Sequence, residues 1–328
     1  MSSIPPTTPT VVQPPQRPKT GKIVAIIAAI VVVVVAGVLI FVNVTKQSNT
    51  ADAADGAITS GLGSPDEPVR IGVVGASDPY WAELTDAAAA DGVSIDLIDF
   101  AEYSQPNPAL SEGELDLNQF QHIVYLAQYN TSASDTLVPV GSTAIYPLGL
   151  YSDKYDSVED IPDGETIAIP NDPSNLSRSL LVLQSVGLVT LNGGGTIYST
   201  LNDIDADNSR IQVTTLEPSL TATSLPDVAA AIINNDFVEP AGLSAEDAIA
   251  QDDPADETAL PYVNVWAATE ENKDNDVLLR VVDIYQNTQS VLDGVVEQSG
   301  DTAVILKTPV AQLEESLATV EADTLANE

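Results

Sequence analysis

Short apolar runs alternate with helical patterns along most of this chain. Arg70–Gly75 is rich in β-branched residues and Ser94–Phe100 alternates polar with apolar residues, so both segments predict strands. Between them, Asp78 and Pro79 predict the start of a helix that stops at Gly92. Similar apolar runs predict strands at residues 137–145, 166–169, 211–216, 228–233 and 262–268. Strands interleaved with helices favour parallel α/β sheets, in which crevices form at the carboxyl ends of the strands.

The clearest helical pattern covers Leu176–Val186. The preceding residues Asp172–Asn175 provide a start, with Asn175 as the expected N-cap, and Gly187 provides the stop. Further helices are predicted at residues 119–129, 277–296 and 309–322. Together these elements predict a large α/β body.

The first 68 residues have a different character. Residues 1–22 are rich in proline and predict a disordered tail. Residues 23–42 contain no charge and would span roughly 30 Å as a helix, the thickness of a bilayer's hydrocarbon core, so we expect a transmembrane helix. A cleaved signal peptide is the alternative, although its apolar region is usually only about 7–15 residues long. Residues 43–68 are small and polar, which predicts a flexible linker.

The basic residues around this apolar segment predict its orientation. Arg17, Lys19 and Lys22 precede the segment and only Lys46 follows it closely. The positive-inside rule therefore places the N-terminus in the cytoplasm. The expected localisation is the cell membrane, with a single pass and an extracytoplasmic body.

The composition excludes several classes of protein. The 48 acidic residues far outnumber the 11 basic ones, and such a surface repels the phosphates of nucleic acids. The absence of cysteine excludes disulfides, thiolate metal sites and cysteine-linked lipid anchors. A single histidine, His122, cannot form a multi-histidine metal site, and no cofactor is expected. Because the sequence contains no G-x-S-x-G, Walker A or H-E-x-x-H motif, we expect a protein that is not an enzyme.

Aromatic residues are concentrated in one part of the chain. Eight of the 16 lie between Phe100 and Tyr155, where they flank His122 and two predicted strand-to-helix junctions. A small-molecule pocket needs apolar and aromatic walls with a few polar groups, and this region provides both. Packing in an ordinary core would account for any single one of these rings.

Arg178 is the most informative single residue. With Asn175 as N-cap, it would lie in the first turn of its helix, where the helix dipole disfavours a cation. A nearby anion would compensate, and a guanidinium beside the free N–H groups of a helix start suits a carboxylate. A salt bridge to an acid such as Asp172 would explain the position equally well, and spacing alone does not decide between the two.

Several separated motifs point to a known family. They are Asn118–His122, Ala144–Pro147, Pro170–Leu180, Ala231–Asn234, Pro261–Asn264 and Glu271–Asp274. In this order, over roughly residues 69–300, they resemble the NlpA/MetQ family, whose members are methionine-binding proteins of ABC importers. The resemblance implies a two-lobed, type II periplasmic-binding-protein fold whose chain crosses between the lobes near Tyr146–Tyr151 and near Tyr262–Asn264. After the N-terminal transmembrane helix, lobe 1 would contain residues 69–147 plus 264–328, and lobe 2 residues 148–263.

The resemblance also implies which residues bind the ligand. Arg178 would hold the α-carboxylate of methionine, while Asn234 and Asn264 would hydrogen bond to its amino and carboxylate groups. The slot for the side chain would be lined by Phe120, His122, Tyr125 and Tyr146. Aromatic walls suit a thioether, because contacts between sulfur and a ring contribute about 0.3–1.5 kcal/mol each.

The sequence departs from the family pattern at three places. Ser177 stands where a glycine usually precedes the arginine, and Val124 where a proline usually precedes the tyrosine. Leu150-Tyr151-Ser152 replaces a Gly-Tyr-Ser triplet. Because these changes lie at the rim of the implied pocket, a different ligand stays open, such as a methionine-containing dipeptide or another small apolar amino acid.

The implied function is that of a membrane-anchored substrate-binding protein. It would capture methionine by hinge closure and deliver it to a separately encoded permease and its ATPase. Family members are typically anchored through a lipidated cysteine, which this chain lacks. A second alternative is a membrane-anchored interaction protein that kept the fold and lost ligand binding.

Overall fold

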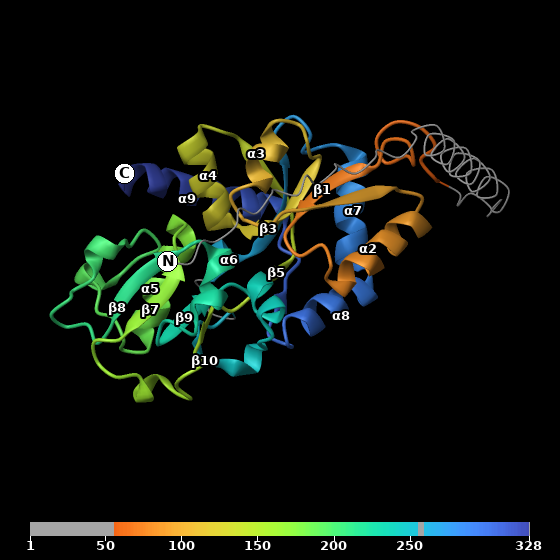
Figure 1. Ribbon diagram of the computed structural model, residues 1–328. Helices are drawn as coiled ribbons and strands as arrows, with labels where there is room; N and C mark the ends of the chain where they lie inside the picture. Colours follow the sequence, from red (N-terminus) through yellow and green to blue (C-terminus); the bar gives the residue numbers. More distant parts are fainter. Residues whose placement is uncertain (1–55, 255–258, 328) are drawn as a thin grey trace, which may run out of the picture. The chain divides into compact units, whose positions relative to one another are not determined.

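A computed structural model describes residues 56–254 and 259–327 of the chain, and two five-stranded sheets form its framework (Figure 1). The strands of the first sheet are β1 (Val69–Val73), β2 (Ile95–Asp99), β3 (Leu117–His122), β4 (Leu137–Ser142) and β11 (Asn264–Thr269). Those of the second sheet are β6 (Gly149–Tyr151), β7 (Thr166–Pro170), β8 (Gln212–Leu216), β9 (Ala230–Ile233) and β10 (Ala248–Gln251). A short antiparallel pair consists of β5 (Ala144–Ile145) and β12 (Val304–Ile305).

Both sheets combine a parallel centre with antiparallel strands. In the first sheet, ordered β2-β1-β3-β11-β4, β1 is parallel to its neighbours and β11 is antiparallel to both of its own. In the second, ordered β10-β6-β9-β7-β8, β7 is parallel to its neighbours and β6 is antiparallel to both of its own. The chain leaves the first sheet after β4, passes through β5, forms the second sheet, and returns to the first with β11. It therefore passes between the two sheets twice.

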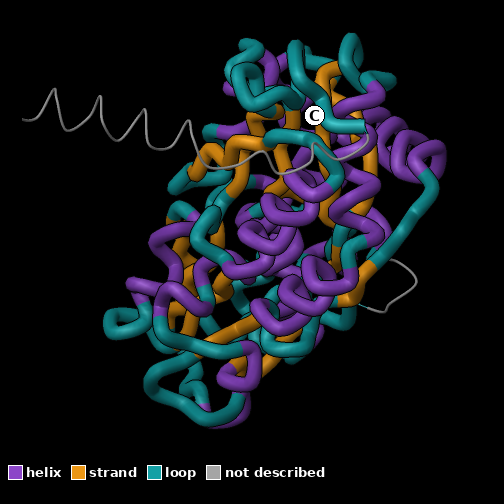
Figure 2. The backbone as a smooth tube through the Cα atoms, turned by 90° about the vertical axis from the view of Figure 1, so that its right-hand side faces the viewer, coloured by secondary structure: helices purple, strands orange, loops and turns teal. Residues whose placement is uncertain are grey.

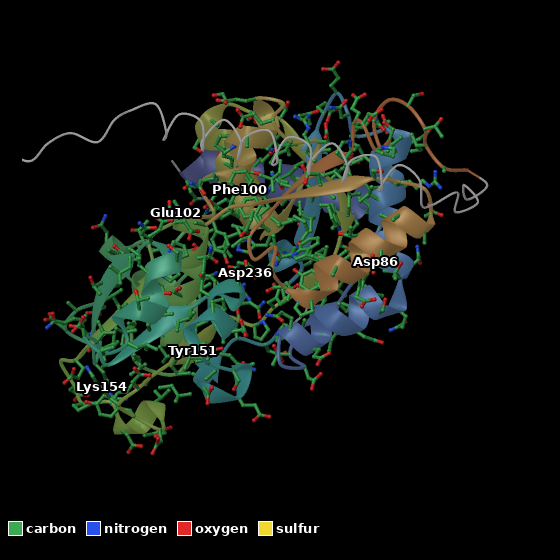
Figure 3. The ribbon with its side chains drawn as sticks, turned by 45° about the vertical axis from the view of Figure 1, so that its right-hand side comes forward. Asp86, Phe100, Glu102, Tyr151, Lys154 and Asp236 are labelled. Carbon is green, nitrogen blue, oxygen red and sulfur yellow. The ribbon has the colours of Figure 1, made fainter. Side chains whose placement is uncertain are left out.

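Helices pack along the faces of these sheets (Figure 2). Around the first sheet they are α2 (Pro79–Ala90), α3 (Pro106–Ser111), α4 (Ile123–Ala133), α7 (Asp276–Asn287), α8 (Gln289–Gln298) and α9 (Val310–Asn327). The helices of the second sheet are α5 (Pro173–Ser185) and α6 (Pro218–Thr221). We call the first sheet with its helices lobe 1 and the second sheet with its helices lobe 2. Phe100 and Asp86 belong to lobe 1, while Tyr151 and Lys154 belong to lobe 2 (Figure 3).

The core of lobe 1 is built around aromatic rings. Trp266 of β11 is fully buried and meets Trp81 of α2 edge-on, with 6.1 Å between the ring centroids. Tyr285 of α7 packs against Trp266 at 5.3 Å, also nearly perpendicular. Perpendicular arrangements suit the charge distribution of aromatic rings and add to the energy of burial. These three rings fix α2 and α7 on one face of the first sheet.

Most of the predicted elements are confirmed. The strands expected at residues 70–75 and 94–100 are β1 and β2, and the helix expected between them is α2. The predicted helix at 277–296 is two helices, since Thr288 has a non-helical backbone between α7 and α8. Residues 56–68, expected to end a flexible linker, hydrogen bond to lobe 1, for example from Ile58 N to Gly92 O at 2.9 Å.

The prediction of a helix over residues 119–129 is wrong at its start, because Leu117–His122 forms strand β3. The strand is buried along its whole length, although four of its six residues are polar. Asn107 of α3 donates to Gln121 Oε1 at 2.7 Å and accepts from Asn118 at 2.9 Å. Side-chain hydrogen bonds thus allow polar residues to line a buried strand. Helix α4 begins only at Ile123.

The predicted N-terminal transmembrane helix is not supported. Within residues 56–254 and 259–327, no helix is both long enough and apolar enough to cross a membrane. Even α9, with 18 residues, carries acidic side chains such as Glu314 and Glu321. The segment proposed for the span, 23–42, lies outside the described residues, as do the tail 1–22 and most of the linker. The corrected architecture is a two-lobed α/β fold.

Candidate functional site

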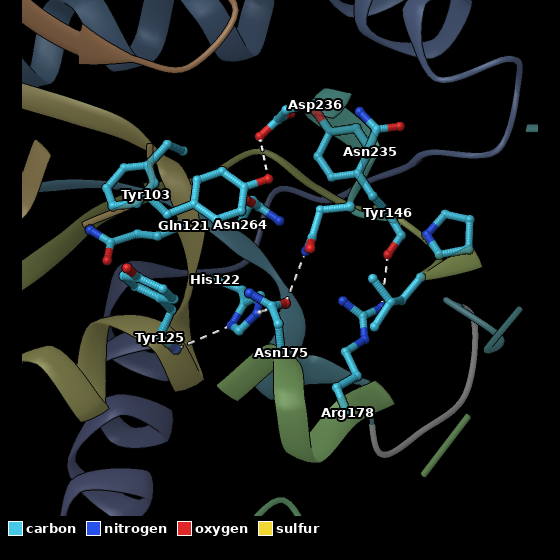
Figure 4. A pocket seen from close by; sticks show the side chains of 14 residues that line it. Tyr103, Gln121, His122, Tyr125, Tyr146, Asn175, Arg178, Asn235, Asp236 and Asn264 are labelled. Carbon is cyan, nitrogen blue, oxygen red and sulfur yellow. Dashed lines mark hydrogen bonds between the residues drawn. The ribbon is translucent and has the colours of Figure 1, made fainter. Parts of the chain in front are cut away.

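A pocket lies where the two lobes meet, and side chains from both lobes line it (Figure 4). Lobe 1 contributes Tyr103, Phe120, Gln121, His122, Tyr125, Tyr146 and Asn264. Lobe 2 contributes Asn175, Arg178, Asn234, Asn235 and Asp236. The cavity has a volume of about 40 Å³, which is room for a few water molecules. All seven residues predicted to contact the ligand line this one pocket.

The topology of the sheets brings these residues together. His122 is the last residue of β3, and Asn264, the first residue of the antiparallel β11, lies directly opposite it. Asn234 follows the last residue of β9 in lobe 2. Arg178 and Asn175 lie one turn apart on α5, the helix that follows the parallel strand β7. The pocket is therefore at the carboxyl ends of parallel strands in both sheets, where α/β folds place their ligands.

Aromatic rings form one wall of the pocket. Phe120 and Tyr125 lie 5.6 Å apart, nearly perpendicular, and Tyr103 lies 5.9 Å from Phe120. Phe237 of lobe 2 meets Tyr103 at 5.2 Å, so this group of rings extends across the junction of the lobes. A wall of this kind favours an apolar or thioether side chain. Tyr103 was not among the predicted site residues.

Arg178 is buried, with 6% of its surface exposed, and is held by three groups. Its Nε donates to Asp252 Oδ2 at 2.6 Å, and its Nη2 donates to Asp252 Oδ1 at 3.1 Å and to the carbonyl oxygen of Tyr146 at 2.8 Å. The guanidinium carbon lies 4.4 Å from the centre of the Tyr262 ring. Nη1 makes no hydrogen bond to another described residue, and Arg178 is one of the residues that line the pocket.

These contacts correct the predicted environment of Arg178. The N-cap of α5 is Asp172, whose side chain accepts from the backbone N of Asn175, so Arg178 lies in the second turn rather than the first. The helix dipole acts mainly on the first turn, and its penalty on this cation is correspondingly small. The salt bridge that was an alternative does exist, but its partner is Asp252 and not Asp172. Arg178 is thus both ion-paired and part of the pocket.

A chain of polar contacts joins the lobes beside Arg178. His122 of lobe 1 lies 3.4 Å from Asn175 Oδ1, and Asn234 Nδ2 donates to the same oxygen at 3.0 Å. On its other side, His122 Nδ1 accepts from the backbone N of Tyr125 at 3.2 Å. A ring that accepts at Nδ1 carries its proton on Nε2, which can then donate to Asn175. Asn175, expected only to cap the helix, is therefore a pocket residue that connects the lobes.

The protonation of His122 can be checked directly, because it is the only histidine. Burial, followed by the nearby positive charge of Arg178, lowers the pKa of His122 to about 3. We expect its ring NMR resonances to stay constant between pH 5 and pH 8, and a titration with a midpoint near 6.5 would contradict the buried position. Because the unfolded chain takes up this proton near pH 6.5, the histidine lowers stability as the pH falls from 6.5 towards 3.

Two acidic groups near the pocket were not predicted. Asp236 lines the cavity, and its Oδ2 accepts from the hydroxyl of Tyr103 at 2.8 Å, across the junction of the lobes. Asp252 pairs with Arg178 and also accepts from the backbone N of Leu148, where the chain crosses between the lobes. Acidic residues are so frequent in this sequence that spacing gave no signal for either. Within the described parts of the chain, no group of three or more acidic or histidine residues is arranged to hold a metal.

Comparisons with known proteins identify relatives of this chain. A family model described as NlpA lipoprotein matches residues 69–305. The D-methionine-binding lipoprotein MetQ of Escherichia coli (strain K12) is 37% identical over 226 residues, or 67% of this chain and 82% of that protein.

Solved structures give the same result. A nutrient-binding protein from Burkholderia cenocepacia bound to methionine has a TM-score of 0.67 and 33% identity, covering 72% of this chain and 99% of that one. A periplasmic substrate-binding protein of an ABC transporter from Coxiella burnetii has a TM-score of 0.68 and 32% identity, covering 73% and 100%. These likenesses confirm the predicted type II periplasmic-binding fold.

Proposed function

Because the chain belongs to the NlpA lipoprotein family, as its motifs predicted, we propose that it is the substrate-binding protein of an ABC importer and that its ligand is methionine. The observation that carries the proposal is a buried guanidinium and an aromatic wall in one pocket between two lobes. A free amino acid has a carboxylate for the first and a side chain for the second.

The proposed contacts follow the geometry of the pocket. We place the α-carboxylate of the ligand against the remaining hydrogen-bond donors of Arg178. Asn234 and Asn264, which line the same pocket, bind the polar groups of the ligand from opposite lobes. The thioether lies against the group formed by Phe120, His122, Tyr125 and Tyr146. The proposed protein binds its ligand without catalysing a reaction and uses no cofactor.

Closure of the two lobes is the proposed mechanism of capture. The division falls at the two crossings, with residues 69–147 plus 264–328 moving against residues 148–263. In this mechanism, opening of the cleft breaks contacts between the lobes such as Tyr103 with Asp236 and His122 with Asn175. A ligand that touches both lobes favours the closed state by the difference between its affinities for the two states.

The proposed partners are a permease and an ATPase, since the chain itself contains no Walker A motif for a nucleotide. The MetQ relative is described as a lipoprotein, whereas this chain has no cysteine to which a lipid could be attached. We place the two lobes on the extracytoplasmic side of the cell membrane, where such a protein meets its permease. The high negative net charge favours solubility of the protein and gives no information about its ligand.

Calorimetry on the full-length protein tests the proposal. We expect L- or D-methionine to bind with measurable heat and, at a hundredfold excess over Kd, to stabilise the fold by about 2.7 kcal/mol. Leucine, which lacks the sulfur, serves as the matched control and is expected to bind more weakly. Binding of a methionine-containing dipeptide in preference to methionine would identify the alternative ligand. If no amino acid or dipeptide gives heat, the protein is a member of the family that has lost ligand binding.

A further inference from the structure

The pocket contains a buried acceptor without a donor and a carboxylate without a cationic partner among the described residues. Asn234 is about nine-tenths buried, and its Oδ1 has no hydrogen-bond partner in the described residues. Its Nδ2 donates a hydrogen bond to Asn175 Oδ1. An unsatisfied buried acceptor costs about 1–3 kcal/mol and calls for an explanation. Two residues further along the chain, Asp236 also lines the pocket (Figure 4). Both acceptors follow strand β9 and face the same cavity.

Asp236 has no cationic partner among the described residues. None of the ion pairs among the described residues includes it, and its hydrogen bonds come from Tyr103 and Asn235. Figure 3 places it at the junction of the lobes, whereas Lys154 is at the outer end of lobe 2. Arg178, the cation of the pocket, is neutralised by Asp252.

The other charged and titratable groups around Asp236 make its ionised form less favourable. Asp78, just before α2 in lobe 1, interacts unfavourably with Asp236, and Glu239 follows on the same segment as Asp236. The tyrosines that face it, Tyr80, Tyr103 and Tyr146, are neutral hydroxyls with raised pKa values. Burial raises the pKa of Asp236 to about 6, so it is ionised above neutral pH. A cation next to this carboxylate favours its ionised form.

We propose that Asp236, together with Asn234 Oδ1, binds the ammonium group of the ligand. An ammonium is a compact cation with three donors and no acceptor, which matches an amide oxygen that has no donor and a carboxylate that has no cation among the described residues. The assignment rests on the proposed function and deepens it. It makes the pocket selective for ligands with a free primary ammonium, whether they are amino acids or dipeptides.

The same contact couples recognition to closure. Asp236 belongs to lobe 2, and its other oxygen accepts from Tyr103 of lobe 1. An ammonium that binds Asp236 offsets the repulsion between this carboxylate and Asp78 across the cleft. The closed arrangement therefore becomes more favourable when the ligand's cation is present. An amino acid without its ammonium would leave that repulsion in place.

A cycle of two ligands and two proteins isolates this contact. The ligands are L-methionine and 4-(methylthio)butanoate, the same molecule without its amino group, and the proteins are the full-length wild type and Asp236→Asn. Calorimetry at pH 8, where Asp236 is ionised, gives for each protein the Kd of 4-(methylthio)butanoate divided by the Kd of L-methionine. We expect this ratio to be about 10- to 100-fold smaller in Asp236→Asn than in the wild type, since hydrogen bonds to charged groups are the strong ones. Alanyl-methionine, tested on both proteins, shows whether a dipeptide ammonium uses the same site.

The control is Asp207→Asn, which removes an exposed charge from lobe 2 and is expected to leave the ratio unchanged. Asp236→Ser is a second variant in case the asparagine form does not fold. An unchanged ratio in folded Asp236 variants, with normal binding of methionine, would overturn the assignment alone. A wild type that binds none of these ligands would instead overturn the proposed function, and this assignment with it.

Discussion

Replacing Arg178 by alanine is expected to abolish most of the affinity for methionine. Truncating one partner of a desolvated, hydrogen-bonded charge pair costs about 2–5 kcal/mol, which corresponds to a loss of at least about 30-fold in Kd. The ligand loses its carboxylate partner, and Asp252 is left without its cation. We expect Arg178→Lys to be intermediate, because an ammonium cannot make the side-on contact that the guanidinium makes with Asp252. Calorimetry with methionine measures both effects.

Lobe 2 offers a closely matched control for this experiment. Arg210 also donates from Nε to an aspartate, Asp163, at 2.9 Å and from Nη2 to a backbone carbonyl, that of Ile161. Its side chain is 35% exposed and lies outside the pocket, so Arg210→Ala is expected to leave methionine binding within twofold of the wild type. If Arg178→Ala binds methionine as well as Arg210→Ala does, the proposed ligand site is wrong.

The position of Arg178 connects the ligand to the motion of the lobes. Its guanidinium donates to the carbonyl of Tyr146, and its partner Asp252 accepts from the backbone N of Leu148. Tyr146 and Leu148 belong to the first crossing between the lobes, and Asp252 follows β10 at the start of the second. A carboxylate that binds Arg178 therefore contacts a group already bonded to both crossings. This arrangement offers a physical route from ligand binding to closure.

The sequence predicted the fold well where the pattern of apolar residues was regular. The strands β1, β2, β7 and β8 are runs of apolar or alternating residues, and each was found within two residues of its bounds. It failed at β3, whose residues Asn118 and Gln121 are buried because Asn107 supplies their hydrogen bonds. That partner lies 11 and 14 residues away from them, beyond the reach of any local pattern.

The residues of the pocket were predicted from family motifs rather than from physical reasoning. The motifs indicated Arg178, Asn234 and Asn264, and all three line one cavity. Their roles in binding stay predictions. The position of Arg178 indicated that an anion accompanies it, but spacing gave no means to choose Asp252, which lies 74 residues away. Asp236 stood among 48 acidic residues, and only its place in the cavity distinguishes it from them.

The second large effect concerns the stability of lobe 1. Trp266 is fully buried on β11, between β3 and β4, and packs against Trp81 and Tyr285. We expect Trp266→Ala to lower the free energy of unfolding by about 3–5 kcal/mol, because the cavity left behind cannot collapse between two rings held by α2 and α7. Urea unfolding measures this loss, and the fluorescence of Trp81, the other tryptophan of the chain, reports it from within the same core.

Two further variants separate the contribution of volume from that of the polar edge. Trp266 Nε1 is buried and has no hydrogen-bond partner among the described residues, so the native ring already includes an unfavourable N–H group. Trp266→Phe removes that group while keeping an aromatic ring, and its loss is expected to be less than half that of the alanine variant. Leu220→Ala, at a side chain that is 52% exposed, should change stability by no more than about 0.5 kcal/mol. A loss below about 1 kcal/mol in Trp266→Ala would mean that this ring does not hold the sheet, and that Asn264, two residues earlier on the same strand, is positioned by other contacts.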